Sequence, residues 1–283
     1  MTSPHLESVP CPYCCSIDSD AWGHELGFTA VRCTSCAIIY CNPRPAAELI
    51  DHAVRTGVHG SEAGGLVVRS RRDRAKVIRY RNIFQLMFDD VWRSGVPIAW
   101  LDVGAGYGEI LEAVALLAPN GSSISGLEPM HIKAVSARER GLTIVEGYLR
   151  RNHPKVDLIS VVDVFSHIPD FALFLEDVRH VLVVGGQIFI ETGNLADLQS
   201  RQDFPGELGL PDHLVFAGEK HLLGFLDRAG FDVVQIRRVR IDGALNFIKN
   251  LVKKIIGRPA GIGIPYTSKY RQLQVRARLR VIV

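Results

Sequence analysis

The feature that most constrains this chain is a glycine-rich turn, Leu101-Asp102-Val103-Gly104-Ala105-Gly106-Tyr107-Gly108, between an apolar run and a helical pattern. Glycines let the backbone turn sharply and approach a ligand, and the first N–H groups of the following helix are free to bind it. Glu128 ends the next apolar run, 20 residues after Gly108. An acid at a strand end can accept hydrogen bonds from ribose hydroxyls. Together these features predict a nucleotide-type cofactor site in an α/β domain.

Short β-rich runs alternate with helical runs from Pro97 onward. The predicted strands are 98–103, 123–128, 142–145, 157–162, 187–192 and 231–240, and the predicted helices follow Gly108, begin at Ile132, and span 171–182 and 219–229. Such alternation predicts a mostly parallel sheet with helices on both faces. The expected fold class is therefore α/β with a Rossmann-like sheet.

The spacing of the turn separates two kinds of cofactor. Dinucleotide-binding folds use Gly-x-Gly-x-x-Gly, whereas this chain has Gly-x-Gly-x-Gly, and Asp102 can hold the amino-acid end of a cofactor through its ammonium group. These residues resemble the class I S-adenosylmethionine-dependent methyltransferases. Residues 102–108 resemble the first motif of that family, 161–170 its fourth-strand motif, and 181–190 its turn into the fifth strand. A nicotinamide enzyme is the alternative.

The resemblance implies a set of cofactor-binding residues. They are Asp102, Gly104, Gly106, Gly108, Glu128, Tyr148, Leu149 and Asp163. Tyr148 and Leu149 follow the third strand and are expected beside the adenine. The family often has Glu-His in the fourth-strand motif, but this chain has Ser166-His167. No role can rest on that glutamate here.

The cysteines all lie near the N-terminus. Two Cys-x-x-Cys pairs, Cys11/Cys14 and Cys33/Cys36, are 18 residues apart, which is typical of a four-cysteine zinc ribbon. We expect a structural zinc with no open ligand position; a reduced thiol cluster or a disulfide pair is the alternative. Cys15 and Cys41 fall outside the pairs, although Cys15 could replace Cys14. Residues 32–45 resemble the ribbon that precedes the methyltransferase domain in enzymes acting on sugars and polysaccharides.

Two histidines are candidates for a general base. Methyl transfer to a hydroxyl group requires removal of a proton, and histidine titrates near neutral pH. His213 lies in a loop that resembles the one after the fifth strand of sugar methyltransferases, and His167 follows the fourth strand. We expect His213 to be the base, oriented by Asp212 or another acid, with His167 as the second candidate.

Breaks in the pattern divide the chain into four parts. The Asn42-Pro43-Arg44-Pro45 turn ends the cysteine-rich part. We expect a zinc ribbon over 1–45, a helical connector or lid over 46–95, the S-adenosylmethionine-binding domain over 96–242, and a basic amphipathic segment over 243–283.

The basic charge is concentrated at the C-terminal end. Residues 237–283 contain twelve Lys/Arg and one acid, whereas the whole chain has a formal charge of +3. Apolar residues recur at helical spacing over 244–256, which predicts an amphipathic helix ending at Gly257. Its apolar face could pack on the domain or on a second subunit, or the helix could bind an anionic membrane surface or a lipid-linked, phosphate-bearing acceptor. Lys/Arg at 258, 269, 271, 276, 278 and 280 would extend that attraction.

The predicted function is S-adenosylmethionine-dependent methylation of a hydroxyl on a sugar, glycan or lipid-linked saccharide. The sugar acceptor rests on the family resemblance. Alternatives are a ribosomal RNA methyltransferase, disfavoured because the ribbon is not rich in Lys/Arg, and a non-catalytic scaffold. Without a signal sequence or an apolar run of about 20 residues, we expect a cytoplasmic protein, with the basic segment allowing contact with the inner membrane face.

Overall fold

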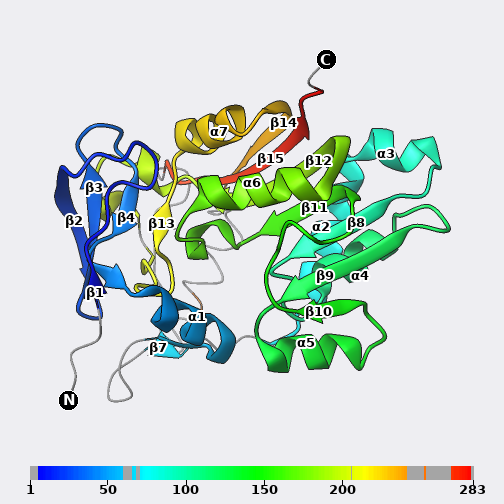
Figure 1. Cartoon of the computed structure of the whole chain (residues 1–283), viewed down its shortest axis with the longest axis horizontal. Helices are drawn as coiled ribbons and strands as arrows, with labels where there is room; N and C mark the ends of the chain where they lie inside the picture. The colour runs from blue at the N-terminus through cyan, green and yellow to red at the C-terminus, as the bar shows by residue number, and fades with distance from the viewer. Residues whose placement is uncertain are drawn as a thin grey trace.

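The computed structural model describes residues 6–59, 66–67, 71–204, 206–240, 252 and 269–281 (Figure 1). Its centre is a seven-stranded sheet in the order β10-β9-β8-β11-β12-β15-β14. The strands are β8 Ala99–Val103, β9 Ser123–Glu128, β10 Ile144–Glu146, β11 Val156–Val162, β12 Leu182–Gly193, β14 Phe231–Val239 and β15 Gln272–Leu279. The strands from β10 to β12 are parallel, and β15 is antiparallel to both neighbours. The predicted α/β, Rossmann-like fold is confirmed.

Helices cover both faces of this sheet. They are α1 Ala47–Thr56, α2 Arg74–Met87, α3 Asp89–Ser94, α4 Glu109–Ala115, α5 His131–Arg138, α6 Phe171–Val181 and α7 Glu219–Arg228. Alternate residues of β11 enter different cores: Leu158 packs with α2 and α4, whereas Ile159 packs with α6 and α7. Because successive side chains of a strand point to opposite faces, the apolar run of β11 contributes to the hydrophobic core on each face of the sheet. The sheet is therefore buried between two layers of helices.

The connector helix α2 is attached to the sheet through a buried carboxylate. Glu191, which is fully buried on β12, accepts hydrogen bonds from Tyr80 (2.5 Å) and Arg79 (2.9 Å) of α2. It also accepts bonds of 2.5 Å from Gln272 and Gln274 of β15. Four donors compensate the buried charge, so α2, β12 and β15 are held together at the end of the sheet that carries the functional cavity.

Strand β15 was not predicted from the sequence. Its residues Leu273, Val275 and Ala277 are fully buried. Arg276 belongs to this strand, and Arg280 follows directly after it. Arg276 is 3% exposed and pairs with Asp90 at 2.6 and 2.8 Å, and Arg280 pairs with Asp232 at 2.7 Å. Arg276 is therefore buried and does not contribute to the basic surface expected at this end of the chain, whereas Arg280 is 41% exposed and its partners Asp227 and Asp232 are exposed as well. The predicted helix over 244–256 lies outside the described residues, apart from Val252.

The N-terminal ribbon, residues 6–45, is joined to the domain of the seven-stranded sheet by a second sheet that both parts share. It contains β1 Leu6–Glu7, β2 Ser19–Glu25, β3 Phe28–Cys33, β4 Ile39–Cys41 and β5 Arg44–Pro45. Strand β13, Val215–Phe216, pairs with β4 although it follows β12 in the chain. The ribbon therefore forms one sheet with part of the segment between β12 and α7. Figure 1 shows β13 beside β4, with the ribbon at one end of the molecule.

The remaining elements connect these parts. Strands β6 Val58–His59 and β7 Leu66–Val67 form a short antiparallel pair after α1, and three 3-10 turns, η1 Phe165–His167, η2 Leu195–Asp197 and η3 Arg201–Asp203, follow β11 and β12. None of the helices among the described residues has the length and apolar character that crossing a bilayer requires.

Candidate active site

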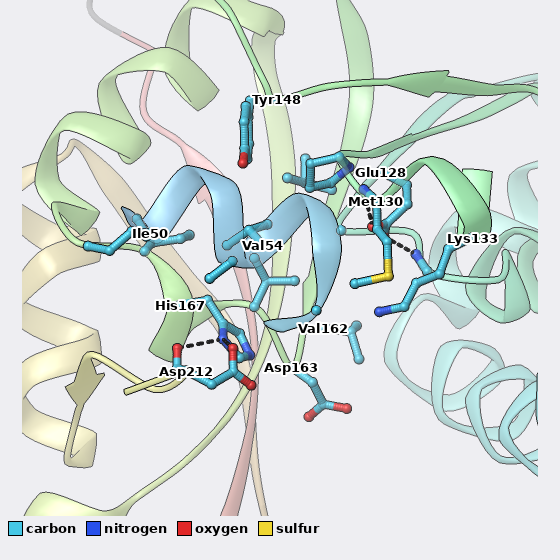
Figure 2. A pocket seen from close by; sticks show the side chains of 18 of the residues that line it. Ile50, Val54, Glu128, Met130, Lys133, Tyr148, Val162, Asp163, His167 and Asp212 are labelled. Atoms are coloured by element: carbon cyan, nitrogen blue, oxygen red, sulfur yellow. Dashed lines mark hydrogen bonds and ion pairs between the residues drawn. The ribbon is translucent and has the colours of Figure 1, made fainter. Parts of the chain in front are cut away.

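A cavity of about 620 Å³ lies at the carboxyl ends of β8, β9, β10 and β11. Helix α1 forms its roof, and Ile50 and Val54 of that helix line it (Figure 2). Of the residues predicted to bind a cofactor, six line this cavity: Gly104, Gly106, Glu128, Tyr148, Leu149 and Asp163. The carboxyl ends of parallel strands are where α/β sheets bind ligands, so this is the expected place for the site.

The glycine turn requires glycine at its first two positions. Gly104 has φ of +75°, and a Cβ there would lie 2.3 Å from a methyl carbon of Val164. Gly106 has φ of +55°, and its N–H donates to Glu128 Oε2 at 2.7 Å. Glu128 is 5% exposed, and its Oε1 accepts a bond of 2.9 Å from the Met130 N–H. Each carboxylate oxygen can accept a second bond, so Glu128 shapes the loop and still offers acceptors to a ligand.

Two residues of the predicted cofactor set do not line the cavity. Gly108 has φ of +84°, and a Cβ there would lie 2.3 Å from Leu142, so its role is close packing. Asp102 is 1% exposed and accepts a bond of 2.5 Å from Ser160, while its Oδ2 has no hydrogen-bond partner among the described residues. Burial raises the pKa of Asp102 to about 7. The direct cofactor contacts predicted for Gly108 and Asp102 do not fit this geometry, because both are covered by protein.

The opposite wall of the cavity comes from the turn after β10. Tyr148 is 38% exposed, Leu149 is buried, and the guanidinium of Arg55 from α1 lies 5.2 Å from the centre of the Tyr148 ring. Figure 2 shows Tyr148 on the far side of α1 from His167, with Met130 beside Glu128. An aromatic ring and apolar side chains on this wall provide contacts that a planar base can use.

Asp163 has an unusual backbone conformation. It follows β11 directly, has φ of +57°, and its side chain is about half exposed toward the cavity. Lys76 Nζ from α2 lies 3.8 Å from its Oδ2. A non-glycine residue in this conformation is uncommon and is concentrated at functional sites, which supports the predicted role of Asp163 in the cavity.

His167 and Asp212 form a hydrogen-bonded pair at the cavity wall. The Nδ1 atom of His167 lies 2.9 Å from both the carboxylate Oδ1 and the main-chain oxygen of Asp212. Because a main-chain carbonyl only accepts, Nδ1 carries a proton, and in the neutral imidazole Nε2 retains a lone pair. Burial alone lowers the pKa of His167, but the hydrogen bonds and charge of Asp212 outweigh it and raise the pKa.

A third residue of this group, His59, was not predicted. It belongs to β6 of the connector, is 5% exposed, and its Nε2 lies 3.2 Å from the same Asp212 Oδ1. Burial lowers the pKa of His59, so the imidazole is neutral near pH 7 and donates to the carboxylate. No local motif marks His59, because its role depends on the fold of the connector over the cavity.

His213, the preferred base in the sequence prediction, lies behind His167. Its Nδ1 is 2.7 Å from the main-chain oxygen of Leu208, its ring is 4.8 Å from the His167 ring, and it is not among the residues that line the cavity. Burial and the neighbouring His167 lower its pKa. Of the two predicted histidines, His167 lines the cavity and His213 does not.

The four paired cysteines converge at one point of the ribbon. The Sγ atoms of Cys11 and Cys36 are 3.5 Å apart, those of Cys14 and Cys33 are 3.6 Å apart, and all four lie within 4.8 Å of one another. All six cysteines are free thiols, and Cys15 and Cys41 are outside the cluster. The pKa of the Cys33 thiol is lowered to about 7. Burial raises this pKa, but hydrogen bonds from the Cys36 and Ser35 main chain lower it by more than burial raises it. The disulfide alternative is not present.

Comparisons with known proteins agree with this geometry. A family model described as a methyltransferase domain matches residues 72–236. A ubiquinone biosynthesis O-methyltransferase of Serratia proteamaculans is 26% identical over 145 residues, which are 45% of this chain and 59% of that protein, and the one of Histophilus somni is 30% identical over 33% of this chain and 44% of its own length. The chain thus matches about half the length of these relatives.

Among solved structures, a candidate sarcosine dimethylglycine methyltransferase from Galdieria sulphuraria has a TM-score of 0.52 at 15% identity, covering 71% of this chain and 85% of its own, which shows the shared fold. The family model extends over more than half of the chain and includes the glycine turn, Glu128 and the His167 segment. The chain therefore belongs to the methyltransferase domain family.

Proposed function

We propose that this enzyme methylates a hydroxyl oxygen, with His167 as the general base. The observation that carries the proposal is the His167–Asp212 pair in the same cavity as the glycine turn and Glu128. Asp212 holds the proton on Nδ1 and leaves Nε2 available to accept a proton from the acceptor hydroxyl. Asp212 would then stabilise the imidazolium, and the pKa of this partly buried carboxyl is lowered because burial is outweighed by the hydrogen bond and charge of His167.

The cavity residues fit S-adenosylmethionine. The glycine turn would hold the amino-acid end, Glu128 the ribose hydroxyls, and Tyr148 with Leu149 the adenine. Gly104 lines the cavity, and the space that a Cβ would take at this position is filled by the Val164 side chain. When bound, S-adenosylmethionine supplies an electrophilic methyl group, and the protein holds the acceptor oxygen in line with it. Asp163 would lie beside both groups.

For the acceptor we propose a sugar or glycan intermediate, including a lipid-linked one. This rests on the resemblance of the ribbon to that of sugar methyltransferases, and polar side chains near His167, namely His59, Asp163 and Asp212, are suited to a polyhydroxylated acceptor. A phenolic hydroxyl is the second candidate, because the named relatives are ubiquinone biosynthesis O-methyltransferases. A nucleic acid acceptor has no observation in its favour.

We also propose that the four paired cysteines bind one structural zinc ion. Tetrahedral zinc with Zn–S distances of about 2.3 Å places its sulfur ligands about 3.8 Å apart. The observed Sγ–Sγ separations, 3.5 Å between Cys11 and Cys36 and 3.6 Å between Cys14 and Cys33, are close to this value. Four thiolates leave no open ligand position, so the metal would stabilise the ribbon and take no part in methyl transfer.

The proposed activity can be tested with labelled S-adenosylmethionine and a panel of acceptors. The panel contains nucleotide sugars, lipid-linked saccharides, catechols and a ribosomal RNA transcript, and product mass spectrometry with NMR locates the new methyl group. We expect an O-methylated product that His167→Gln reduces by ~10²-fold or more. A product methylated on nitrogen or carbon, or full activity of His167→Gln, would refute the proposal.

A further inference from the structure

We propose that Glu25 of the ribbon is a positioning residue for the His167–Asp212 pair. Its carboxylate fixes the loop that carries Asp212, so the ribbon forms part of the support of the active site. This inference rests on the proposed role of His167 as base. It assigns the N-terminal ribbon a function in methyl transfer beyond metal binding.

Glu25 accepts hydrogen bonds from three consecutive main-chain N–H groups. Its Oε2 lies 2.7 Å from the Leu208 nitrogen, and its Oε1 lies 2.7 Å from that of Gly209 and 3.3 Å from that of Leu210. A carboxylate that accepts several main-chain N–H bonds forms charge-assisted contacts, which are about twice as strong as neutral ones. Leu208 and Leu210 are fully buried, so these N–H groups would have few alternative acceptors.

The loop held by Glu25 leads directly to Asp212. The His213 N–H donates to the Gly209 oxygen at 2.9 Å, which closes the turn around Asp212. On the far side, the Leu214 N–H donates to the Ser166 oxygen at 2.7 Å, next to His167, and the Cys41 N–H of β4 donates to the Leu214 oxygen at 2.8 Å. Asp212 is thus held from the ribbon on both sides, by Glu25 before it and by β4 after it.

The position of Asp212 decides the state of His167. Both oxygens that contact His167 Nδ1, at 2.9 Å, belong to Asp212, so a shift of the loop moves both. The other titratable groups around the pair are His59, which shares the Asp212 carboxylate, His213, whose ring faces His167, and Asp163. None of them replaces the contacts of Asp212 with Nδ1, so Glu25 acts on His167 through this loop.

The first test measures the pKa of His167 directly and needs no acceptor. Carbon-13 NMR of the histidine Cε1 groups is recorded against pH for the full-length, zinc-loaded protein, with His167→Gln used to assign the signal. We expect Glu25→Gln to lower the pKa of His167 by roughly 0.5 to 1 unit, because the Asp212 contact weakens. Asp20→Asn removes an equal charge from an exposed position on the same strand and should leave this pKa unchanged.

The second test measures turnover with the acceptor found in the panel. Glu25→Gln should lower kcat roughly 10- to 100-fold, with the Kd of S-adenosylmethionine unchanged, because a catalytic group is displaced and not removed. In a His167→Gln background the same change should add little, since Glu25 acts through His167. Zinc content and the unfolding midpoint are measured for each variant, and Glu25→Asp, which keeps the charge and shortens the reach, is used if Glu25→Gln does not fold.

The outcomes separate this inference from the proposed function. An unchanged pKa of His167 in Glu25→Gln, or a loss of turnover that is equally large in the His167→Gln background, overturns the role of Glu25 and leaves His167 as the base. Full turnover of His167→Gln overturns the proposed function itself, whatever the NMR titration gives.

Discussion

The Nδ1 atom of His167 lies 2.9 Å from Oδ1 of Asp212, and this contact joins the turn after the fourth parallel strand to a loop supported by the ribbon. The two residues are 45 positions apart in the chain. The proton acceptor of the proposed reaction is therefore assembled only when the sheet, the loop after β12 and the ribbon have all formed.

Replacement of His167 should affect chemistry and not cofactor binding. We expect His167→Gln to lower kcat by ~10² to 10⁴, the usual contribution of a positioned base, with the Kd of S-adenosylmethionine within about two-fold of the wild-type value. Single-turnover kinetics and calorimetry measure the two quantities. His213→Gln is the matched control and should cost less, because His213 is outside the cavity; a larger loss in His213→Gln would mean that the other histidine is the base.

The pH dependence of kcat should change when the negative charge of Asp212 is removed. Asp212 stabilises the protonated form of His167 and raises its pKa. Asp212→Asn removes that charge, so the pKa of His167 falls and the acid limb of the kcat profile moves to lower pH, by about one unit. The plateau should also fall roughly 10-fold, because a base of lower pKa is weaker. The prediction fails when the acid limb stays in place or moves to higher pH.

Glu128 should contribute to affinity for the cofactor. We expect Glu128→Ala to weaken S-adenosylmethionine binding by ~1.5 to 3 kcal/mol, through lost hydrogen bonds to a charged group and a less ordered glycine turn. Isothermal titration calorimetry gives the value. Glu139→Ala, an exposed acid at the end of α5, serves as the control and should bind as the wild type does. Equal affinity for both variants would exclude Glu128 from the site.

Metal analysis should find about one zinc per chain in protein purified without chelator. Cys33→Ser should lose the zinc and lower the unfolding temperature, because Cys33 is buried within the four-sulfur cluster. Cys15→Ser should keep it, since Cys15 is exposed and lies outside that cluster. Zinc retained in Cys33→Ser and lost in Cys15→Ser would assign the ligands differently.

The ionised carboxylate of Asp102 should lower the free energy of unfolding at neutral pH. Its pKa rises from 3.8 to about 7 in the folded protein. A carboxyl group with a raised folded pKa favours folding most below its unfolded pKa, and that contribution is lost as pH rises from about 4 to about 7. Asp102→Asn should therefore raise the free energy of unfolding by roughly 2 to 4 kcal/mol at pH 8 and much less at pH 4. Urea denaturation at the two pH values measures this; an equal effect at both would contradict it.

The parts of the fold that are local in the sequence could be predicted. The glycine turn, Glu128 and the alternating apolar runs each identify their own element, and β9 was predicted with its observed bounds, Ser123–Glu128. Each of these signals depends on residues within a short window, where strand or helix periodicity and turn residues are sufficient.

The parts that depend on distant partners could not be predicted. Strand β15 looks basic and exposed in the sequence. It is buried because it pairs with β12 and β14, and the charge of Arg276 is compensated by Asp90, 186 positions away. The choice between His167 and His213 depends on which side chain lines the cavity, and this becomes visible only in the assembled fold. His59 enters the site only because α1 and β6 fold over the sheet.

The place of β15 has a consequence for synthesis of the protein. It is the last of the described strands, yet it lies between β12 and β14 and pairs with both along most of its length. While the ribosome is still translating residues 272–279, β12 has a free edge and β14 has no neighbour in the sheet. Free strand edges pair readily with other chains, so nascent or truncated forms that lack these residues should aggregate. A deletion aimed at the basic segment has to retain residues 269–281 to leave the methyltransferase sheet closed.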